Sequence, residues 1–341
     1  MRKISEIFIN GICLEKILED HEKWLIDNYK GKRLKLKNTD LSFTDLRGAN
    51  LKNADLSDID LSGADLSGAD LRNADLSYVN LRGANLSDTD LSSANLRDAD
   101  LNNTDLSFAD LRCVDLSYAD LKDANLSYTD LRFAYLRFAN LIDTNLIDTN
   151  LKDAKLDCAN LKDADLSYAD LRFASLSSAN LNGTNLRFAD LSGAYLKGAD
   201  LSGADLRDVD LSNAGLIGAN LNEVSYNHQT SFFAMQCPEK GSFIGYKKAK
   251  NKIVELLITE DSERSSATTR KCRCSKAKVL SITNIGNTEE FSEVVSDYDE
   301  DFIYKVGEIV KVKNFDDDRW NECSTGIHFF ITRDEAIIYR N

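Results

Sequence analysis

Leucine occupies every fifth position from Leu36 to Leu221 without exception. A helix repeats its faces every 3.6 residues and a strand every two, so neither element alone explains a period of five. Two positions before each leucine the residue is small or compact, as at Ala64, Thr89 and Val114. Asp or Asn usually precedes the leucine, and polar residues usually follow it. The pattern predicts that leucine and the compact residue are buried and that the other side chains face water, because an unpaired buried charge is very costly.

A five-residue unit is too short to close a core alone, so the units must stack on their neighbours. The repeats follow the pattern A-[DN]-L-[SRKN]-x and resemble the pentapeptide repeat family over about 190 of the 341 residues. The resemblance implies an all-β, right-handed quadrilateral β-helix with one repeat per side and four per coil. At about 4.8 Å per layer, 38 repeats would form a rod roughly 45 Å long. Residues 20 apart would then lie in one column along the rod.

Two other segments flank the repeats, which predicts three parts: 1–35, 36–224 and 225–341. In residues 1–35, apolar residues recur at helical spacing and charged residues lie between them, which predicts an amphipathic helix that caps the first coil; the apolar positions are Leu14, Ile17, Leu18, Trp24 and Leu25. No signal peptide and no membrane-spanning stretch is expected. The seven scattered cysteines then predict reduced thiols and a cytoplasmic location.

Residues 225–341 lose the five-residue period and read as an α+β domain with mostly antiparallel strands. Short β-branched runs such as "FIGYKKA", "KIVELLI" and "GIHFFIT" predict strands. Thr332 and Glu335 have the spacing of a capping box, which predicts a last short helix. The segments "ERSSATTRKCRC" and "DRWNECSTGIHFF" resemble an uncharacterised domain attached to other pentapeptide repeat proteins, and that resemblance implies no mechanism.

The candidate site of this domain comprises Arg270, Cys272, Cys274, Cys323 and His328. The thiols and the imidazole could converge on zinc, together with Cys237. The C-x-C spacing is equally explained by two buried thiols on one face of a strand, and the missing C-x-x-C pairs favour that explanation. The hydroxyls and cations of residues 265–271 suit either an anion or a polar turn. No cofactor, metal or catalytic residue is predicted.

A second candidate surface lies on the rod, where the Asp/Asn position departs from its consensus. The departures occur at intervals of 20 and therefore share one column: Tyr135, Lys155, Ser175, Tyr195 and Gly215. Nearby aromatic residues, Phe133, Phe138 and Phe173, follow their leucines by two positions. Exposed aromatics gathered in one half of a rod indicate an interaction surface. The alternative is that the rings stack between coils and shield the backbone.

The formal net charge of −14 arises entirely within residues 41–224. An acidic rod repels nucleic acid and anionic membranes and attracts basic partners, so neither direct nucleic-acid binding nor membrane binding is expected. The family resemblance also implies a DNA-mimic inhibitor of a type II topoisomerase (gyrase) as one alternative. Against it, a column that includes Arg72, Arg112 and Arg172 runs beside the aspartates of one face.

The sequence therefore predicts a non-catalytic protein-binding or scaffold protein, in which a rigid acidic rod presents the C-terminal domain. Its partner would be a protein that the sequence does not identify, and a homodimer is a further option. The alternatives are DNA mimicry and an unrecognised enzymatic activity in residues 225–341.

Overall fold

The computed structural model describes residues 1–231, 233, 235–321 and 324–339. The chain forms two compact units. The first comprises Met1–Ala214 and Ala219–Thr230, and the second comprises Gly215–Gly218 and Ser231–Asn341.

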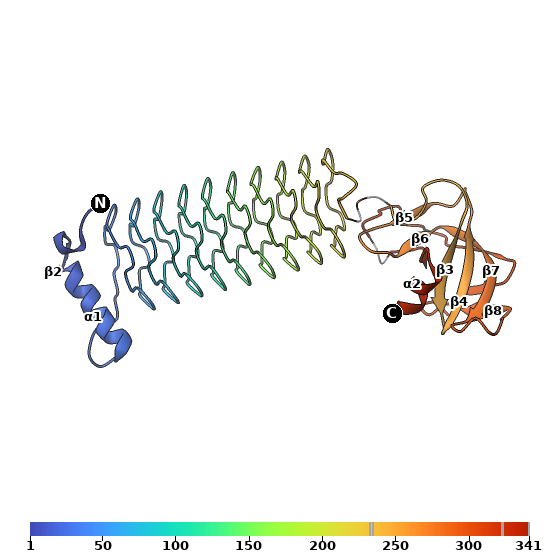
Figure 1. The fold of residues 1–341 in the computed structure, drawn as a ribbon, viewed down its shortest axis with the longest axis horizontal. Helices are drawn as coiled ribbons and strands as arrows, with labels where there is room; N and C mark the ends of the chain where they lie inside the picture. The colour runs from blue at the N-terminus through green and yellow to red at the C-terminus, as the bar shows by residue number, and fades with distance from the viewer. Residues whose placement is uncertain (232, 234, 322–323, 340–341) are drawn as a thin grey trace. The chain divides into compact units, whose positions relative to one another are not determined.

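The repeats of the first unit wind into stacked coils (Figure 1). Each Asp/Asn position forms a parallel bridge with the residue 20 positions along the chain. For example, the Leu61 N–H donates to the Asn80 carbonyl at 2.8 Å, and the Asn80 N–H donates to the Ile59 carbonyl at 3.0 Å. Between one leucine and the next, the Ala64 N–H donates to the Leu61 carbonyl at 3.0 Å and closes a tight turn. The repeats thus build a right-handed quadrilateral β-helix, which confirms the predicted architecture.

The interior of the β-helix holds the leucines and the compact residues. Leucines of the inner coils, such as Leu71 and Leu116, are fully buried, and the alanines are buried beside them. Threonine replaces alanine at several of these positions, and in the inner coils its hydroxyl bonds a backbone carbonyl, whereas the buried Thr44 Oγ1 near the N-terminal end has no hydrogen-bond partner among the described residues. The Thr104 Oγ1 donates to the Leu81 carbonyl at 2.8 Å, and Thr184 bonds the Leu161 carbonyl in the same way at 3.0 Å. A buried hydroxyl is tolerated here because it finds a backbone acceptor.

The corners of the coils explain the polar part of the repeat. The second residue after each leucine adopts a positive φ, as at Gly68 (+66°) and Asn73 (+55°), which favours Gly, Asn and Asp. The Asp/Asn side chain accepts a hydrogen bond from the backbone two residues later, for example from Ser62 N to Asp60 Oδ1 at 2.9 Å. This Asx turn gives the Asp/Asn position a structural role in every corner where it occurs. The five-residue pattern by itself predicts only that this position faces water.

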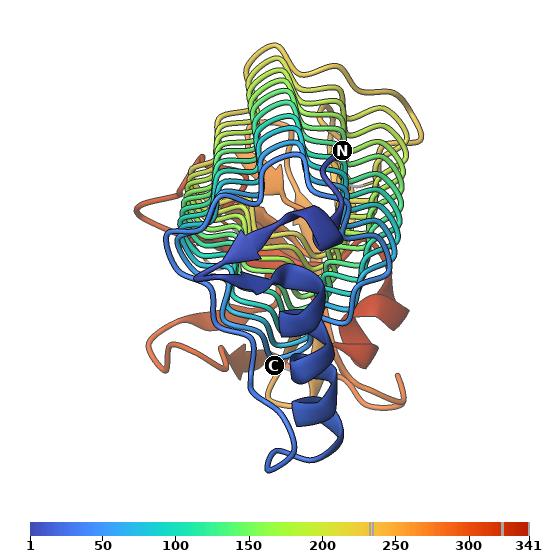
Figure 2. The ribbon, with the colours of Figure 1, turned by 90° about the vertical axis from the view of Figure 1, so that its left-hand side faces the viewer.

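The N-terminal segment covers the first coils of the β-helix (Figure 2). It contains the 3-10 helix η1 (Ile4–Glu6), a hairpin of β1 (Phe8–Ile9) and β2 (Ile12–Cys13), and the helix α1 (Leu14–Ile26). The Asn10-Gly11 turn of the hairpin has a positive φ at both residues, as a type I′ turn requires. His21 of α1 is fully buried: its Nε2 bonds the Lys52 carbonyl at 3.0 Å, and its Nδ1 accepts the Leu34 N–H at 3.1 Å. The predicted capping helix is therefore attached to the coils through a histidine.

The second unit consists of short antiparallel sheets and one helix. One sheet has four strands in the order β10-β7-β4-β3, another has three in the order β11-β6-β5, and β8 pairs with β9. The strands are β3 (Phe243–Ala249), β4 (Lys252–Ile258), β5 (Arg264–Ser266), β6 (Cys272–Cys274), β7 (Lys276–Asn284), β8 (Glu293–Val295), β9 (Ile303–Lys305), β10 (Ile309–Lys311) and β11 (Ile327–Phe329). Helix α2 (Arg333–Ile338) follows the last strand.

Several predicted elements of this unit are confirmed. The runs that begin at Phe243, Lys252 and Gly326 contain β3, β4 and β11. The capping box is present: the Glu335 N–H donates to Thr332 Oγ1 at 3.3 Å, and the Thr332 N–H donates to Glu335 Oε2 at 3.1 Å. The short strands β5, β8 and β9 were not predicted, whereas β6 agrees with the explanation of the C-x-C spacing by two buried thiols on one face of a strand. No helix in the described part of the chain combines the length and apolarity needed to cross a bilayer.

One core joins the sheets of the second unit. Its buried members come from both larger sheets and include Val254, Leu256, Cys274, Val279 and Phe329. In the three-stranded sheet, His328 lies opposite Arg273 and Arg273 lies opposite Ser265. Because side chains alternate along a strand, these residues project from the face opposite Cys272 and Cys274. The two faces of this small sheet thus separate a polar side from the thiols of the core.

Candidate functional site

Four of the departures from the Asp/Asn consensus, Tyr135, Lys155, Ser175 and Tyr195, lie along one side of the β-helix, which we call the contact strip. The fifth, Gly215, belongs to the second unit. Parallel bridges join Tyr135 to Lys155, Lys155 to Ser175 and Ser175 to Tyr195. Tyr135 and Tyr195 are 50% and 58% exposed, Lys155 is also exposed, and Ser175 and Gly215 are half-buried. The strip therefore presents two tyrosine rings, a cation and a small residue over successive coils.

The strip uses different coil-to-coil contacts from those of the acidic columns. At these corners no carboxylate is available to accept the backbone N–H two residues later. Instead, Arg137 pairs with Asp157 of the next coil at 3.2 Å, and the Ser175 Oγ donates to the same Asp157. Side-chain bonds between these coils therefore use Arg137 and Asp157, two positions after the strip residues, while the backbone bridges between the strip residues are kept.

The phenylalanines beside the strip combine packing with exposure. Phe133, Phe138 and Phe173 occupy corners with positive φ and are 53%, 51% and 48% exposed. Phe138 stacks on Tyr118 with 5.0 Å between ring centroids, and Phe173 covers Gly193 of the next coil. Two further stacks, Phe108 with Tyr128 and Tyr168 with Phe188, lie on another side. Stacking between coils and an outward-facing aromatic surface coexist in the same rings.

Arginines neutralise part of the acidic surface. Arg72 pairs with Asp70 of its own repeat and with Asp90 of the next coil, the latter at 3.5 Å. Arg112 repeats this arrangement with Asp110 and Asp130, at 2.5 and 3.9 Å. Hydrogen bonds from these guanidinium groups lower the pKa of Asp70 and Asp110. The carboxylates of this side are therefore paired with arginines and do not form a column of unpaired negative charges.

The described cysteines of the C-terminal unit, Cys237, Cys272 and Cys274, belong to its buried core. Cys272 and Cys274 are fully buried, and Cys237 belongs to the same cluster. Burial raises the pKa of Cys274 to about 12, so this thiol is protonated at pH 7. Cys323 lies outside the described residues. Within the described residues, no three His, Cys, Asp or Glu side chains gather in a way that could hold a metal ion.

Arg270 joins the loop before β6 to helix α2. Its Nε donates to Glu335 Oε1 at 2.6 Å, and its Nη1 donates to Gln236 Oε1 at 3.2 Å. Glu335 belongs to the first turn of α2, so this ion pair ties the loop before β6 to the helix. The nearby hydroxyl residues are buried: Ser265 and Ser266 of β5 and Thr268 of the loop are each at most 3% exposed, and Ser266 Oγ accepts the Gln236 N–H at 2.7 Å.

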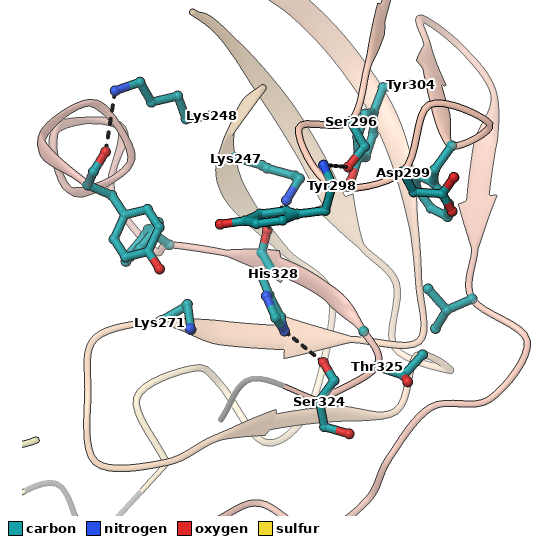
Figure 3. Close-up of a pocket in the computed structure, with 15 residues that line it drawn as sticks. Lys247, Lys248, Lys271, Ser296, Tyr298, Asp299, Tyr304, Ser324, Thr325 and His328 are labelled. Atoms are coloured by element: carbon teal, nitrogen blue, oxygen red, sulfur yellow. Dashed lines mark hydrogen bonds between the residues drawn. The ribbon is translucent and has the colours of Figure 1, made fainter. Parts of the chain in front are cut away.

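The remaining candidate, His328, lines a cavity of about 490 Å³ (Figure 3). Its Nε2 bonds the Ser324 carbonyl at 3.0 Å. Burial, together with Lys271, Lys247 and Arg273, lowers the pKa of His328 to about 4, so the ring is neutral at pH 7. Lys247, Lys248 and Lys271 line the same cavity, with the aromatic residues Tyr298, Phe302, Tyr304, Phe330 and Tyr339. Arg270 and the two described cysteines of the predicted site are not among the lining residues.

The family of the chain follows from its repeats. Overlapping matches to the model of pentapeptide repeats (8 copies) span residues 33–127 and 129–225, more than half of the chain. The chain belongs to the pentapeptide repeat family. Residues 233–336 match a separate family of unknown function (DUF5758). No curated protein matches the chain.

Solved structures of pentapeptide repeat proteins resemble the chain. HetL, described as involved in heterocyst differentiation regulation in the cyanobacterium Nostoc sp. strain PCC 7120, is 33% identical over 59% of this chain and 92% of its own, with a TM-score of 0.45. The protein alr5209 of Nostoc PCC 7120 is 46% identical over 25% of this chain and 71% of its own, with a TM-score of 0.25. QnrB1, described as a plasmid-mediated fluoroquinolone resistance protein, is 18% identical over 57% and 91%, with a TM-score of 0.30.

Sequence reasoning about this pentapeptide repeat protein missed most of the cavity. Lys247 belongs to a predicted strand, Lys271 to a predicted polar turn, and Tyr298 to a segment to which no role was assigned. The only signal was the pair of segments 263–274 and 318–330, which contribute Lys271, His328 and their neighbours. The convergence of Lys247 with these residues depends on strand pairing across more than 80 positions.

Proposed function

We propose that the protein is a non-catalytic binding protein whose β-helix is a rigid platform and whose contact strip binds another protein. The observation that carries the proposal is the strip itself. Two half-exposed tyrosines, Tyr135 and Tyr195, replace the acidic consensus in one column, three coils apart. Tyrosine is enriched at protein interfaces because it offers a large rigid surface and a hydroxyl group.

The backbone supports the platform role. Every inner coil is bonded to the coils on both sides, as the bonds around Leu61 and Asn80 illustrate. A surface held in this way loses little conformational entropy when it binds a partner. The spacing of Tyr135 and Tyr195, about 14 Å for three layers, suits one partner that contacts both rings.

Inhibition of gyrase through DNA mimicry is the second candidate. It is favoured by the concentration of the net charge of −14 in the repeats and by the acidic column Asp55, Asp75 and Asp115. The ion pairs of Arg72 and Arg112 weigh against it, because they neutralise the carboxylates of a neighbouring side.

The two candidates are separated by variants of the full chain. In the first arm, Tyr135→Asp with Tyr195→Asp is compared with Tyr78→Asp, which changes a ring that is 63% exposed outside the strip. If the contact strip binds another protein, the affinity of the double variant for that partner, or for a second copy of the chain, should fall at least about tenfold, because interface energy is concentrated in a few anchor residues. Tyr78→Asp should retain both. The proposal would be contradicted if the double variant captured the partner as well as the parent protein does, or if its thermal stability fell in proportion to its binding.

The second arm measures inhibition of DNA supercoiling. Asp55, Asp75 and Asp115 are replaced by Asn, because Asn keeps the oxygen that the corner requires while it removes the charge. DNA mimicry expects inhibition by the parent protein and weaker inhibition by the triple variant. Absence of inhibition by the folded parent protein would remove this candidate and leave the strip proposal untouched.

A further inference from the structure

The cavity of the C-terminal unit gathers cations from three separate elements. Lys247 and Lys248 come from β3, Lys271 comes from the loop before β6, and His328 comes from β11. Figure 3 shows the Lys247 amine, the His328 ring and the Lys271 amine around one part of the cavity, with the Tyr298 ring beside them. None of these residues belongs to the β-helix or to the contact strip.

These lysines have no carboxylate partner within the described residues. The ion pairs of this part of the chain join Arg270 to Glu335, Lys276 to Asp261 and Lys305 to Glu293, and so do not include them. Asp299 also lines the cavity, but it lies well apart from the Lys247 and Lys271 amines in Figure 3 and accepts the Asp301 N–H at 3.0 Å.

The lysines differ in how far the protein already uses them. Lys248 donates to the Ile337 and Tyr339 carbonyls, both at 3.3 Å, and so stabilises the end of α2. Lys247 donates to the His328 carbonyl at 3.4 Å, and the Lys271 amine lies 5.8 Å from the centre of the Tyr339 ring. Each ammonium group has three donors. Lys247 and Lys271 therefore keep donors for a ligand.

The surroundings of Lys247 favour an anion in the cavity. Burial lowers the pKa of Lys247, while Asp297 opposes that shift from a distance beyond an ion pair. A buried ammonium group without a paired charge is costly. An anion between Lys247 and Lys271 would compensate both charges.

The His328 ring can also take part. Because Nε2 donates its hydrogen to the Ser324 carbonyl, Nδ1 of the neutral ring is an acceptor. It can accept the O–H of a singly protonated phosphate. If the ring is protonated instead, the same atom becomes a donor to the anion.

The rest of the wall is aromatic. Tyr298, Phe302, Tyr304, Phe330 and Tyr339 line the cavity. A volume of about 490 Å³ lies within the range of small-molecule sites. Aromatic walls suit a planar group, which stacks on ring faces.

We propose that this cavity binds a small phosphate monoester that carries a planar group, with Lys247 and Lys271 on the phosphate and the aromatic wall on the planar group. The site is a binding site separate from the contact strip, and it does not depend on the function proposed above. No bond is made or broken in it.

The test is calorimetric titration of the full chain at pH 7 with two matched pairs of probes. Adenosine monophosphate is compared with adenosine, and phenyl phosphate is compared with phenol. The phosphate member of at least one pair should bind at least about tenfold more tightly than its neutral partner. Inorganic phosphate should bind more weakly than that ester. The proposal is overturned if no phosphate probe binds at about 10 mM, if the neutral partners bind equally well, or if inorganic phosphate matches the esters.

Variants assign the binding to the cavity. Lys247→Met and Lys271→Met keep an unbranched apolar side chain and remove the charge, and each should weaken the binding of the phosphate ester by at least about tenfold. Lys278→Met is the matched control, because Lys278 is exposed on β7 and does not line the cavity. Lys271 is the safer variant if Lys247→Met fails to fold, because it comes from a loop. Unchanged affinity in a folded Lys271→Met protein would place the anion elsewhere and overturn the proposal.

Discussion

The ring of Phe173 lies against Gly193 of the next coil, so closely that a Cβ atom on Gly193 would meet the ring at 2.6 Å. Gly193 also has a φ of +70°, whereas Gly68 occupies the equivalent corner position with a φ of +66° and no atom within 4 Å of an added Cβ. The two glycines thus share a backbone conformation and differ in whether an aromatic ring covers them.

This difference predicts unequal costs for the same substitution. Gly68→Ala should lose about 1 kcal/mol, because an L-residue is strained at positive φ. Gly193→Ala should lose at least about 1 kcal/mol more, because it must also displace the ring. Urea unfolding followed by circular dichroism measures both. Phe173→Ala in the Gly193→Ala background should recover part of the loss, and equal losses for the two glycines would show that the ring does not press on Gly193.

Asp75 provides a test of the corner role of the Asp/Asn position. Its Oδ1 accepts hydrogen bonds from Ser77 N at 3.1 Å, Ser77 Oγ at 2.7 Å and Asn95 Nδ2 at 3.0 Å. Asp75→Ala removes this acceptor and should destabilise the β-helix by about 1–2 kcal/mol. Asp75→Asn keeps an Oδ1 and should stay within about 0.5 kcal/mol of the parent protein. If both variants lose the same stability in urea unfolding, then the charge rather than the acceptor is what matters.

His21 should be essential for the attachment of the cap. His21→Ala leaves the buried Leu34 N–H and the Lys52 carbonyl without their partner, which should cost about 2 kcal/mol. The expected result is faster amide hydrogen exchange at Leu34 and along α1, with unchanged exchange in the central coils. His228→Ala, at an exposed histidine, is the control. Protection of α1 that is the same in both variants would contradict the prediction.

The stability of the C-terminal unit should depend on pH through His328. Burial, with Lys271 and Lys247 nearby, lowers its pKa to about 4 in the folded protein, compared with about 6.5 in an unfolded chain. Between these values the unfolded state binds the extra proton, so the free energy of unfolding falls as the pH falls. The part of the free energy of unfolding that depends on a neutral His328 is fully present above about pH 6.5. It decreases as the pH falls to about 4, and its loss amounts to about 3 kcal/mol.

Trp320 fluorescence during urea unfolding, in a Trp24→Phe background, reports this unit separately from the cap. The slope of stability between pH 6.5 and pH 4 should become smaller in His328→Gln, because the titrating group is gone. A variant with the same slope as the parent protein would assign the effect to other groups, such as the carboxylates that titrate in the same range.

The sequence alone determined the β-helix and its cap. A leucine at every fifth position is consistent with one fold, because each repeat contacts only the repeats beside it and those 20 residues away. Tertiary structure decided which contacts individual polar residues make within that fold. The acceptor role of Asp75, the buried bonds of His21 and the ring of Phe173 over Gly193 all join residues whose spacing says nothing about their side-chain contacts.

In the C-terminal unit the sequence determined less, because nothing there repeats. Periodicity located the longer strands, and Thr332 with Glu335 located the last helix. The pairing of β11 with β6 decided that Cys272 and Cys274 face the core while His328 faces the other way. The cavity arises only when β3, the loop before β6 and β11 meet, since Lys247 and His328 are brought together by contacts between strands that are distant in the chain. A local sequence pattern specifies the β-helix, because its contacts join repeats that are close in the sequence. The cavity needs contacts between distant segments, so only the folded chain shows which residues line it.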